Sequence, residues 1–134
     1  MKLLLDTHIL IWALNDDARL SRKARDLILD ESNDIYYSIV SLWEVAIKHL
    51  SHPEHMRFSA LELAQCCEDA GFLSQEIRSN HIFALETLRR REDAPSHHDP
   101  FDRMLISQAK AEKMFLVTHD ALIPEYEEKC IISV

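Results

Sequence analysis

KLLLDTHILIWAL, residues 2–14, joins a short apolar run to an apolar helix-like stretch through an acidic turn. The run Lys2–Leu5 is typical of a short strand, Asp6-Thr7 bounds it, and Ile9–Leu14 follows with helical character. The same alternation of short apolar runs and helical patterns returns along the chain. Because strands separated by helices pair in one direction, the sequence predicts a parallel α/β sheet covered by helices on both faces.

The remaining elements are predicted from apolar periodicity and turn residues. Four more strands are expected, the first of them aromatic and β-branched, at Ile35–Tyr37, Phe72–Ile77, Met114–Val117 and Ile131–Ile132. Five more helices are expected at Ser21–Glu31, Ile39–Leu50, Ser59–Ala70, Ser79–Arg91 and Pro100–Lys113. Trp12 and Trp43 lie at helical spacing among aliphatic residues, so we expect them to pack in the core rather than stack on nucleic-acid bases.

Length and composition narrow the class of protein. A chain of 134 residues fits one domain, and 47% apolar with 28% charged residues is typical of a soluble globular protein. No apolar run approaches the roughly 20 residues that span a bilayer, and acidic residues interrupt the apolar start, so we expect no membrane association and a cytoplasmic location. The net charge of −8 argues against a protein that coats nucleic acid, but it does not exclude a nuclease with an acidic metal site.

Acidic residues stand at the ends of predicted strands or at the starts of predicted helices. In a parallel α/β sheet these positions face one crevice, so carboxylates far apart in the sequence would meet there. Like charges repel, and such a cluster is tolerable only if a cation or bound protons offset its charge. An anionic pocket lined with oxygen suits Mg²⁺ or Mn²⁺, which are common tools for cleaving phosphodiesters. The acidic residues are Asp6, Glu44, Asp99, Asp102 and Asp120.

Each carboxylate also has a structural explanation. Ser41–Glu44 has the pattern of a capping box, and Asp99–Asp102 has that of a capped helix start with proline at its first position. Asp6 and Asp120 would then be turn residues after buried strands. Their joint placement favours the cation site, because a purely structural set would mix Ser, Thr, Asn and Gly at such junctions.

The acidic residues lie within four longer motifs: LLDTHILIWAL at residues 4–14, SLWEVAIK at 41–48, HHDPFDRMLI at 97–106 and VTHD at 117–120. Together these motifs resemble the PIN-domain family, and most closely the VapC-type toxins of bacterial toxin–antitoxin pairs. The resemblance implies a single PIN-like domain over residues 1–134. It would have three layers, with a central, mostly parallel five-stranded sheet flanked by helices. The implied activity is that of an endoribonuclease that depends on Mg²⁺ or Mn²⁺.

The resemblance assigns the family's acidic quartet to Asp6, Glu44, Asp102 and Asp120. Asp99 is expected to be an accessory that either caps the helix and orients Asp102 or contributes through a metal-bound water. Mg²⁺ keeps several waters and is held by only one or two carboxylates directly. We therefore expect Asp6 and Asp102 to contact the metal. Glu44 and Asp120 would act through water or at a second, weaker site.

Residues beside the quartet are candidates for substrate contacts. Thr7 and Thr118 could orient a carboxylate or the phosphate, although capping or turn hydrogen bonds explain them more simply. Arg103 could pair with a carboxylate or meet the scissile strand. The triplet Arg89, Arg90 and Arg91 could bind phosphates in a salt-dependent manner, or could be a solvated helix end. His97 belongs to the third motif and is expected to shape the pocket.

The partners that the resemblance implies are an RNA substrate, a cognate antitoxin protein and a second copy of the chain in a homodimer. Two alternatives stay open: a catalytically silent PIN-like binding module, and a housekeeping PIN nuclease that has no antitoxin. Two other families with acidic crevices fit poorly. A haloacid-dehalogenase-like phosphatase needs a second aspartate where this chain has His8, and a receiver domain needs an acidic pair that is missing here.

Overall fold

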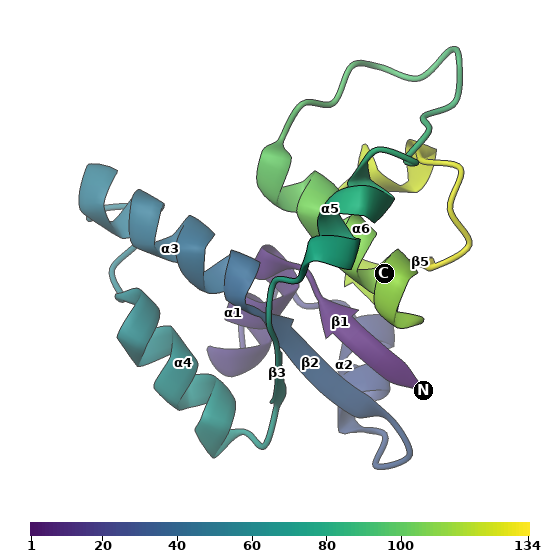
Figure 1. Ribbon diagram of the computed structural model, residues 1–134. Helices are drawn as coiled ribbons and strands as arrows, with labels where there is room; N and C mark the ends of the chain where they lie inside the picture. The colour runs from purple at the N-terminus through teal and green to yellow at the C-terminus, as the bar shows by residue number, and fades with distance from the viewer.

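A five-stranded sheet forms the centre of the computed structural model, which describes residues 1–134. The strands lie in the order β3-β2-β1-β4-β5, and every neighbouring pair is parallel (Figure 1). Their bounds are β1 Lys2–Leu5, β2 Asp34–Ser38, β3 Leu73–Gln75, β4 Phe115–Thr118 and β5 Ile131–Ser133. The predicted α/β fold class is confirmed, and the sheet is wholly rather than mostly parallel.

Six helices connect the strands and cover the sheet, and a 3₁₀ helix, η1, precedes the last strand (Figure 1). Their bounds are α1 Thr7–Leu14, α2 Arg22–Leu29, α3 Ile39–Ser51, α4 Ala60–Asp69, α5 Ser79–Leu85, α6 Pro100–Glu112 and η1 Ile123–Glu125. Gly71, at φ +79°, ends the turn after α4, where an L side chain would be strained. None of the helices has both the length and the apolar character that a membrane span requires.

The central strand β1 divides the core between the two faces of the sheet. Leu3 and Leu5 belong to a cluster with residues of α1, α2 and α4, whereas Leu4 lies in a second cluster with residues of α6. All three leucines are fully buried. Successive side chains of a strand point to opposite faces, so three consecutive leucines fit a strand that is covered on both sides.

Replacing Leu4 by alanine should lower the free energy of unfolding by about 2–5 kcal/mol, because its side chain is fully buried against residues of α6. Leu50, on α3, is 84% exposed, and the control Leu50→Ala should change that free energy by less than about 0.5 kcal/mol. Urea unfolding measures both variants. Equal effects of the two substitutions would contradict the central position of β1.

The helix predicted over Ser79–Arg91 is shorter in the structure, where α5 ends at Leu85. The segment that follows runs antiparallel to residues 125–127. Two backbone hydrogen bonds join the two segments: the Glu127 amide donates to the Arg89 carbonyl at 2.8 Å, and the Arg91 amide donates to the Glu125 carbonyl at 3.0 Å. These long-range bonds override the local helix propensity. The alternative explanation of the arginine triplet as a helix end is therefore wrong.

The prediction of core packing is wrong for Trp43, which is 55% exposed on α3. The buried face of that helix consists of smaller or polar side chains, Val40, Ser41, Glu44 and Val45. The reason is that α3 turns its polar positions toward the edge of the sheet where the acidic residues lie. Trp12 is half-buried and packs against the core cluster around Leu3, so the prediction holds for it in part.

Candidate active site

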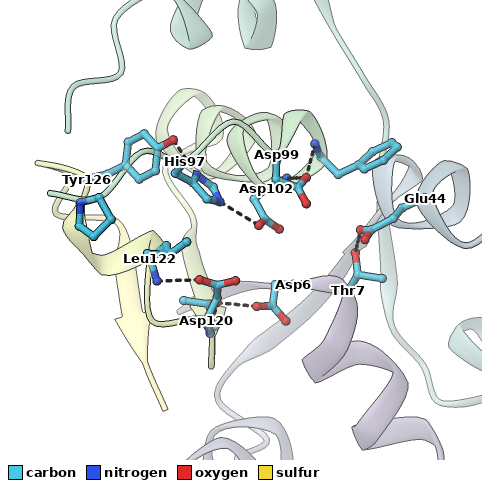
Figure 2. A network of polar contacts seen from close by, with 12 residues as sticks. Asp6, Thr7, Glu44, His97, Asp99, Asp102, Asp120, Leu122 and Tyr126 are labelled. Carbon is cyan, nitrogen blue, oxygen red and sulfur yellow. Dashed lines mark hydrogen bonds and ion pairs between the residues drawn. The ribbon is translucent and has the colours of Figure 1, made fainter. Parts of the chain in front are cut away.

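The candidate carboxylates meet at the edge of the sheet where the strands end. Asp6 follows β1, and Asp120 stands two residues beyond the end of β4. Because β1 and β4 are parallel neighbours, their carboxyl ends lie side by side. Asp102 comes from the first turn of α6 and Glu44 from α3. Figure 2 shows Asp6, Asp102 and Asp120 around one open space, with Glu44 at its side.

Asp6 is fixed by its role as the N-cap of α1. One carboxylate oxygen accepts a hydrogen bond from the Ile9 amide at 2.8 Å, and the other accepts one from the Thr118 hydroxyl. The side chain is buried, and burial raises the pKa of its carboxyl group above the ordinary value of 3.8. Asp6 is therefore a turn residue with a capping function, and it also faces the site.

Asp102 is carried by a capped helix start, as the sequence predicted. The Asp99 carboxylate accepts hydrogen bonds from the amides of Phe101 and Asp102, at 2.9 and 3.1 Å, and Pro100 is the first helical residue. A capped first turn is a rigid mount for a functional side chain. Asp99 thus caps the helix as one of its two expected roles requires, and it lies beside Asp102 (Figure 2).

A chain of buried polar groups supports Asp102 from behind. Nε2 of His97 lies 3.1 Å from Oδ2 of Asp102, and Nδ1 of the same ring lies 2.9 Å from the Tyr126 hydroxyl (Figure 2). His97 and Tyr126 are both buried. The sequence placed His97 at the pocket but missed Tyr126, because it lies 29 residues away in the connection before β5 and no local pattern marks it.

Glu44 lies in the middle of α3 rather than at its start. The helix is capped by Ser38, so the capping-box explanation of Ser41–Glu44 is wrong. The Thr7 hydroxyl donates to one oxygen of Glu44 at 2.7 Å, and Lys48 Nζ donates to the other at 2.6 Å. Sequence reasoning missed Lys48, although its spacing of four residues from Glu44 on a helix is a usable signal for an ion pair.

Thr118 links the Asp6 carboxylate to the backbone of Asp120. Its hydroxyl donates to Asp6 and accepts a hydrogen bond from the Asp120 amide at 3.1 Å. Asp120 Oδ1 accepts from the Leu122 amide at 2.7 Å, as a turn aspartate does, and Oδ2 has no protein partner. Thr7 and Thr118 therefore both orient carboxylates of the quartet.

The carboxylates are close enough to repel one another. The pKa of Asp102 rises from its ordinary value of 3.8 to about 7. The first cause is burial, and the second is the charge of four neighbouring carboxylates, those of Asp99, Asp120, Glu44 and Asp6. Since these groups come from four different segments of the chain, the fold brings together all the acidic residues that the sequence singled out.

Little positive charge offsets this cluster. Lys48 is committed to Glu44, and burial lowers the pKa of the His97 imidazole, which favours its neutral form. The donor set is oxygen-rich and anionic, which suits Mg²⁺ or Mn²⁺. In this conformation no three acidic, histidine or cysteine side chains come close enough to enclose a metal ion together. A hydrated ion held by one or two carboxylates fits such an open arrangement.

The arginines near the site differ in their availability. Arg90 is committed to the fold: its guanidinium donates to the carbonyls of Leu122 and Pro95, at 2.9 and 2.6 Å, and lies 4.7 Å from the centre of the Tyr126 ring. Arg89 and Arg91 are exposed. Arg91 forms ion pairs with Glu125 and Asp93, with N···O distances of 3.5 and 3.9 Å. Arg103 is half-buried on α6, directly after Asp102, and forms no ion pair.

Comparison with known proteins agrees with the fold. The family model of the PIN domain matches residues 3–129. The chain belongs to the PIN domain family. Among solved structures, a chain of VapBC2 from Rickettsia felis, crystallised with a DNA fragment from its promoter, is similar with a TM-score of 0.66 and 17% identity. That match covers 99% of this PIN domain and 98% of the other chain. No curated protein matches.

In the metal-free protein, the raised pKa of Asp102 should make the free energy of unfolding fall as the pH rises from about 4 to about 7. In that range the folded protein keeps a proton that the unfolded chain has already lost, so the slope is negative. The variant Asp102→Asn should lack this contribution. Urea unfolding at a series of pH values measures the difference between the two proteins.

His97 also contributes to the pH dependence, because its pKa in the folded protein is below the ordinary value of 6.5. As the pH rises toward 6.5, the unfolded chain holds more protons on this residue than the folded protein does, so the free energy of unfolding rises. Below about pH 6 the contribution of His97 is small, and because His97 contacts Asp102 at 3.1 Å, the slopes of the two proteins are compared there. The exposed residue Asp26, on α2, provides the control Asp26→Asn, which should keep the wild-type slope. Identical slopes for wild type and Asp102→Asn would contradict the crowding of carboxylates around Asp102.

Proposed function

We propose that this PIN domain is an endoribonuclease that depends on Mg²⁺ or Mn²⁺ and acts as the toxin of a toxin–antitoxin pair. The main support is the set of mutually repelling carboxylates around one space at the edge of the sheet. Buried like charges without counter-charge destabilise a fold. A binding module without metal chemistry would gain nothing from keeping them together, which argues against the silent alternative.

Asp6 and Asp102 are the residues that would hold the metal directly. Hydrogen bonds from Ile9 and Thr118 fix the orientation of Asp6. His97 holds one oxygen of Asp102, and the other oxygen has no protein partner. When bound, the metal lowers the pKa of an attacking water and offsets the charge that develops on the phosphate.

Glu44 and Asp120 would have supporting roles. Both oxygens of Glu44 are occupied by Thr7 and Lys48, so Glu44 is suited to hold Lys48 beside the site rather than to be the first ligand of a metal. Asp120 has one free oxygen and is linked to Asp6 through Thr118, so it is suited to accept the proton of the attacking water. As in the family, cleavage would leave a 3′-hydroxyl and a 5′-phosphate.

Among the basic residues, Arg103 is the one we expect to meet the scissile strand, because it follows Asp102 and has no ion pair. Arg89 is exposed and could bind a phosphate farther along the RNA, with an affinity that falls as salt increases. Arg91 is also exposed but would first have to leave its ion pair with Glu125, at 3.5 Å. Arg90 is not available, since its guanidinium is bound to two carbonyls.

The toxin role is supported by the likeness of the motifs to VapC-type toxins and by the fold shared with the VapBC2 chain. It implies a cognate antitoxin, a homodimer and a cytoplasmic location, which we include in the proposal. Expression of the chain alone should arrest bacterial growth, and expression together with the product of a neighbouring small gene should restore it. Unaffected growth would favour the housekeeping nuclease.

Purified protein should cut single-stranded RNA only with Mg²⁺ or Mn²⁺ present. Asp6→Asn or Asp102→Asn should lower the rate by at least about a hundredfold, because each substitution removes a charged ligand. Mn²⁺ should raise the melting temperature of the wild type, since only the folded site binds it, and should not do so for either variant. Asp26→Asn is the matched control, because it removes the same charge from an exposed position on α2.

Two outcomes would contradict the proposal. Equal cleavage by the wild type and both variants would show that a contaminating nuclease cuts the RNA. If the protein does not cleave RNA and Mn²⁺ does not raise its melting temperature, the silent binding module becomes the better explanation.

A further inference from the structure

A cavity of about 170 Å³ opens beside two of the candidate catalytic carboxylates and is otherwise lined by aromatic rings. Its lining consists of Asp6, Asp120, His8, Trp12 and His119. The hydrolytic roles proposed above use the two carboxylates and leave the three rings without a function. We call the space that His8, Trp12 and His119 line the aromatic cavity.

The fold places the rings of His8 and His119 each against the ring of Trp12. His8 and Trp12 are four residues apart on α1, so they lie on one face of the helix, with ring centroids 5.9 Å apart. His119 follows β4, and its ring centroid is 5.6 Å from that of Trp12, in an edge-on arrangement. Nδ1 of His119 lies 2.7 Å from the Val134 carbonyl oxygen, which fixes the ring.

Two of these rings are held in place, Trp12 by the core and His119 by its hydrogen bond, and none of the three is fully covered. Trp12 packs one part of its indole against the core, while His8 and His119 are exposed. Exposed rings that are fixed in place lose little further freedom when a flat ligand binds against them. Nothing else in the chain covers the aromatic cavity, so its aromatic lining faces the same side of the molecule as the carboxylates.

A second cavity continues from the first past Trp12. It measures about 330 Å³, and Trp12 and His8 line both spaces. The second cavity is lined by two arginines and one glutamate, Glu54. The Arg19 guanidinium lies 5.2 Å from the centre of the Trp12 ring and is paired with Asp17 at 2.8 Å, whereas Arg57 is exposed and forms no ion pair. A path therefore leads from the carboxylates across the aromatic rings to Arg57, the one arginine of the second cavity that could contact a phosphate without breaking an ion pair.

We propose that the aromatic cavity binds one unpaired base of a single-stranded RNA, belonging to a nucleotide next to the phosphate that is cut. The inference rests on the proposed function, which brings that phosphate to the carboxylates. Bases are flat and uncharged, so a base can lie against the rings where a phosphate would be repelled by Asp6 and Asp120. The base must be unpaired, because a base within a duplex is stacked on its neighbours and cannot enter.

Trp12 offers a direct readout of this binding. The chain has two tryptophans, so Trp43→Phe leaves Trp12 as the sole source of tryptophan fluorescence. With Ca²⁺ in place of Mg²⁺, a single-stranded RNA of ten nucleotides should quench this emission, and the same sequence in a duplex should not. RNAs with one abasic nucleotide at successive positions keep all phosphates, and an abasic site at one position should abolish the quenching.

Cleavage kinetics with Mg²⁺ provide a double-mutant cycle between the ring and the base. For the wild type, kcat/KM should fall about tenfold or more when the nucleotide beside the cut is abasic. Trp12→Ala should show a similar loss on intact RNA and no further loss on the abasic RNA, because either change removes the same contact. Trp12→Phe should retain most of the activity, since it keeps an aromatic ring.

The variant His119→Ala tests whether the loss of activity in Trp12→Ala comes from misfolding. Its side chain is exposed, so the variant should keep the wild-type melting temperature and still lose affinity for the intact RNA but not for the abasic one. Two results would overturn the inference without contradicting the nuclease proposal. One is fluorescence quenching that no abasic substitution alters. The other is that the losses in kcat/KM from Trp12→Ala and from the abasic nucleotide simply add. If no RNA is cut at all, the nuclease proposal fails, and the fluorescence titration still decides whether a base enters the cavity.

Discussion

The parallel pairing of β1 with β4 is the constraint on which the whole site depends. It places the residue after β1 beside the last residue of β4, so that the Asp6 amide donates to the Val117 carbonyl at 3.0 Å and the Asp6 carboxylate meets the Thr118 hydroxyl. Asp120 is held by the same hydroxyl. Two buried apolar strands thus keep two carboxylates together against their mutual repulsion, and the stabilisation comes from the core rather than from the site.

The other side of the crevice is supported in a different way. Asp102 is mounted on a capped helix start and is held from behind by His97, which is held in turn by Tyr126. The Arg90 guanidinium lies on the Tyr126 ring and bonds to two carbonyls of neighbouring loops. The polar connector between α5 and α6 and the segment around η1 are therefore drawn together behind Asp102. Such a supporting layer limits the orientations of a ligand residue.

The sequence was sufficient for the fold class and for the acidic set because both depend on local patterns. Apolar runs such as Leu3–Leu5 identify strands, and Asp99-Pro100 identifies a helix start, with no knowledge of tertiary structure. What could not be predicted depends on contacts between distant residues. α5 stops early because residues 89–91 pair with residues 125–127, Tyr126 joins the site across 29 positions, and Trp43 faces outward because α3 buries its polar face.

A crystal structure of the protein grown with Mn²⁺ would show whether a divalent ion occupies the crevice. We expect an anomalous difference peak for manganese between Asp6 and Asp102, with Glu44 bonded to Lys48 and farther from the ion. Absence of a peak there at millimolar Mn²⁺, or a peak only elsewhere on the surface, would contradict this expectation.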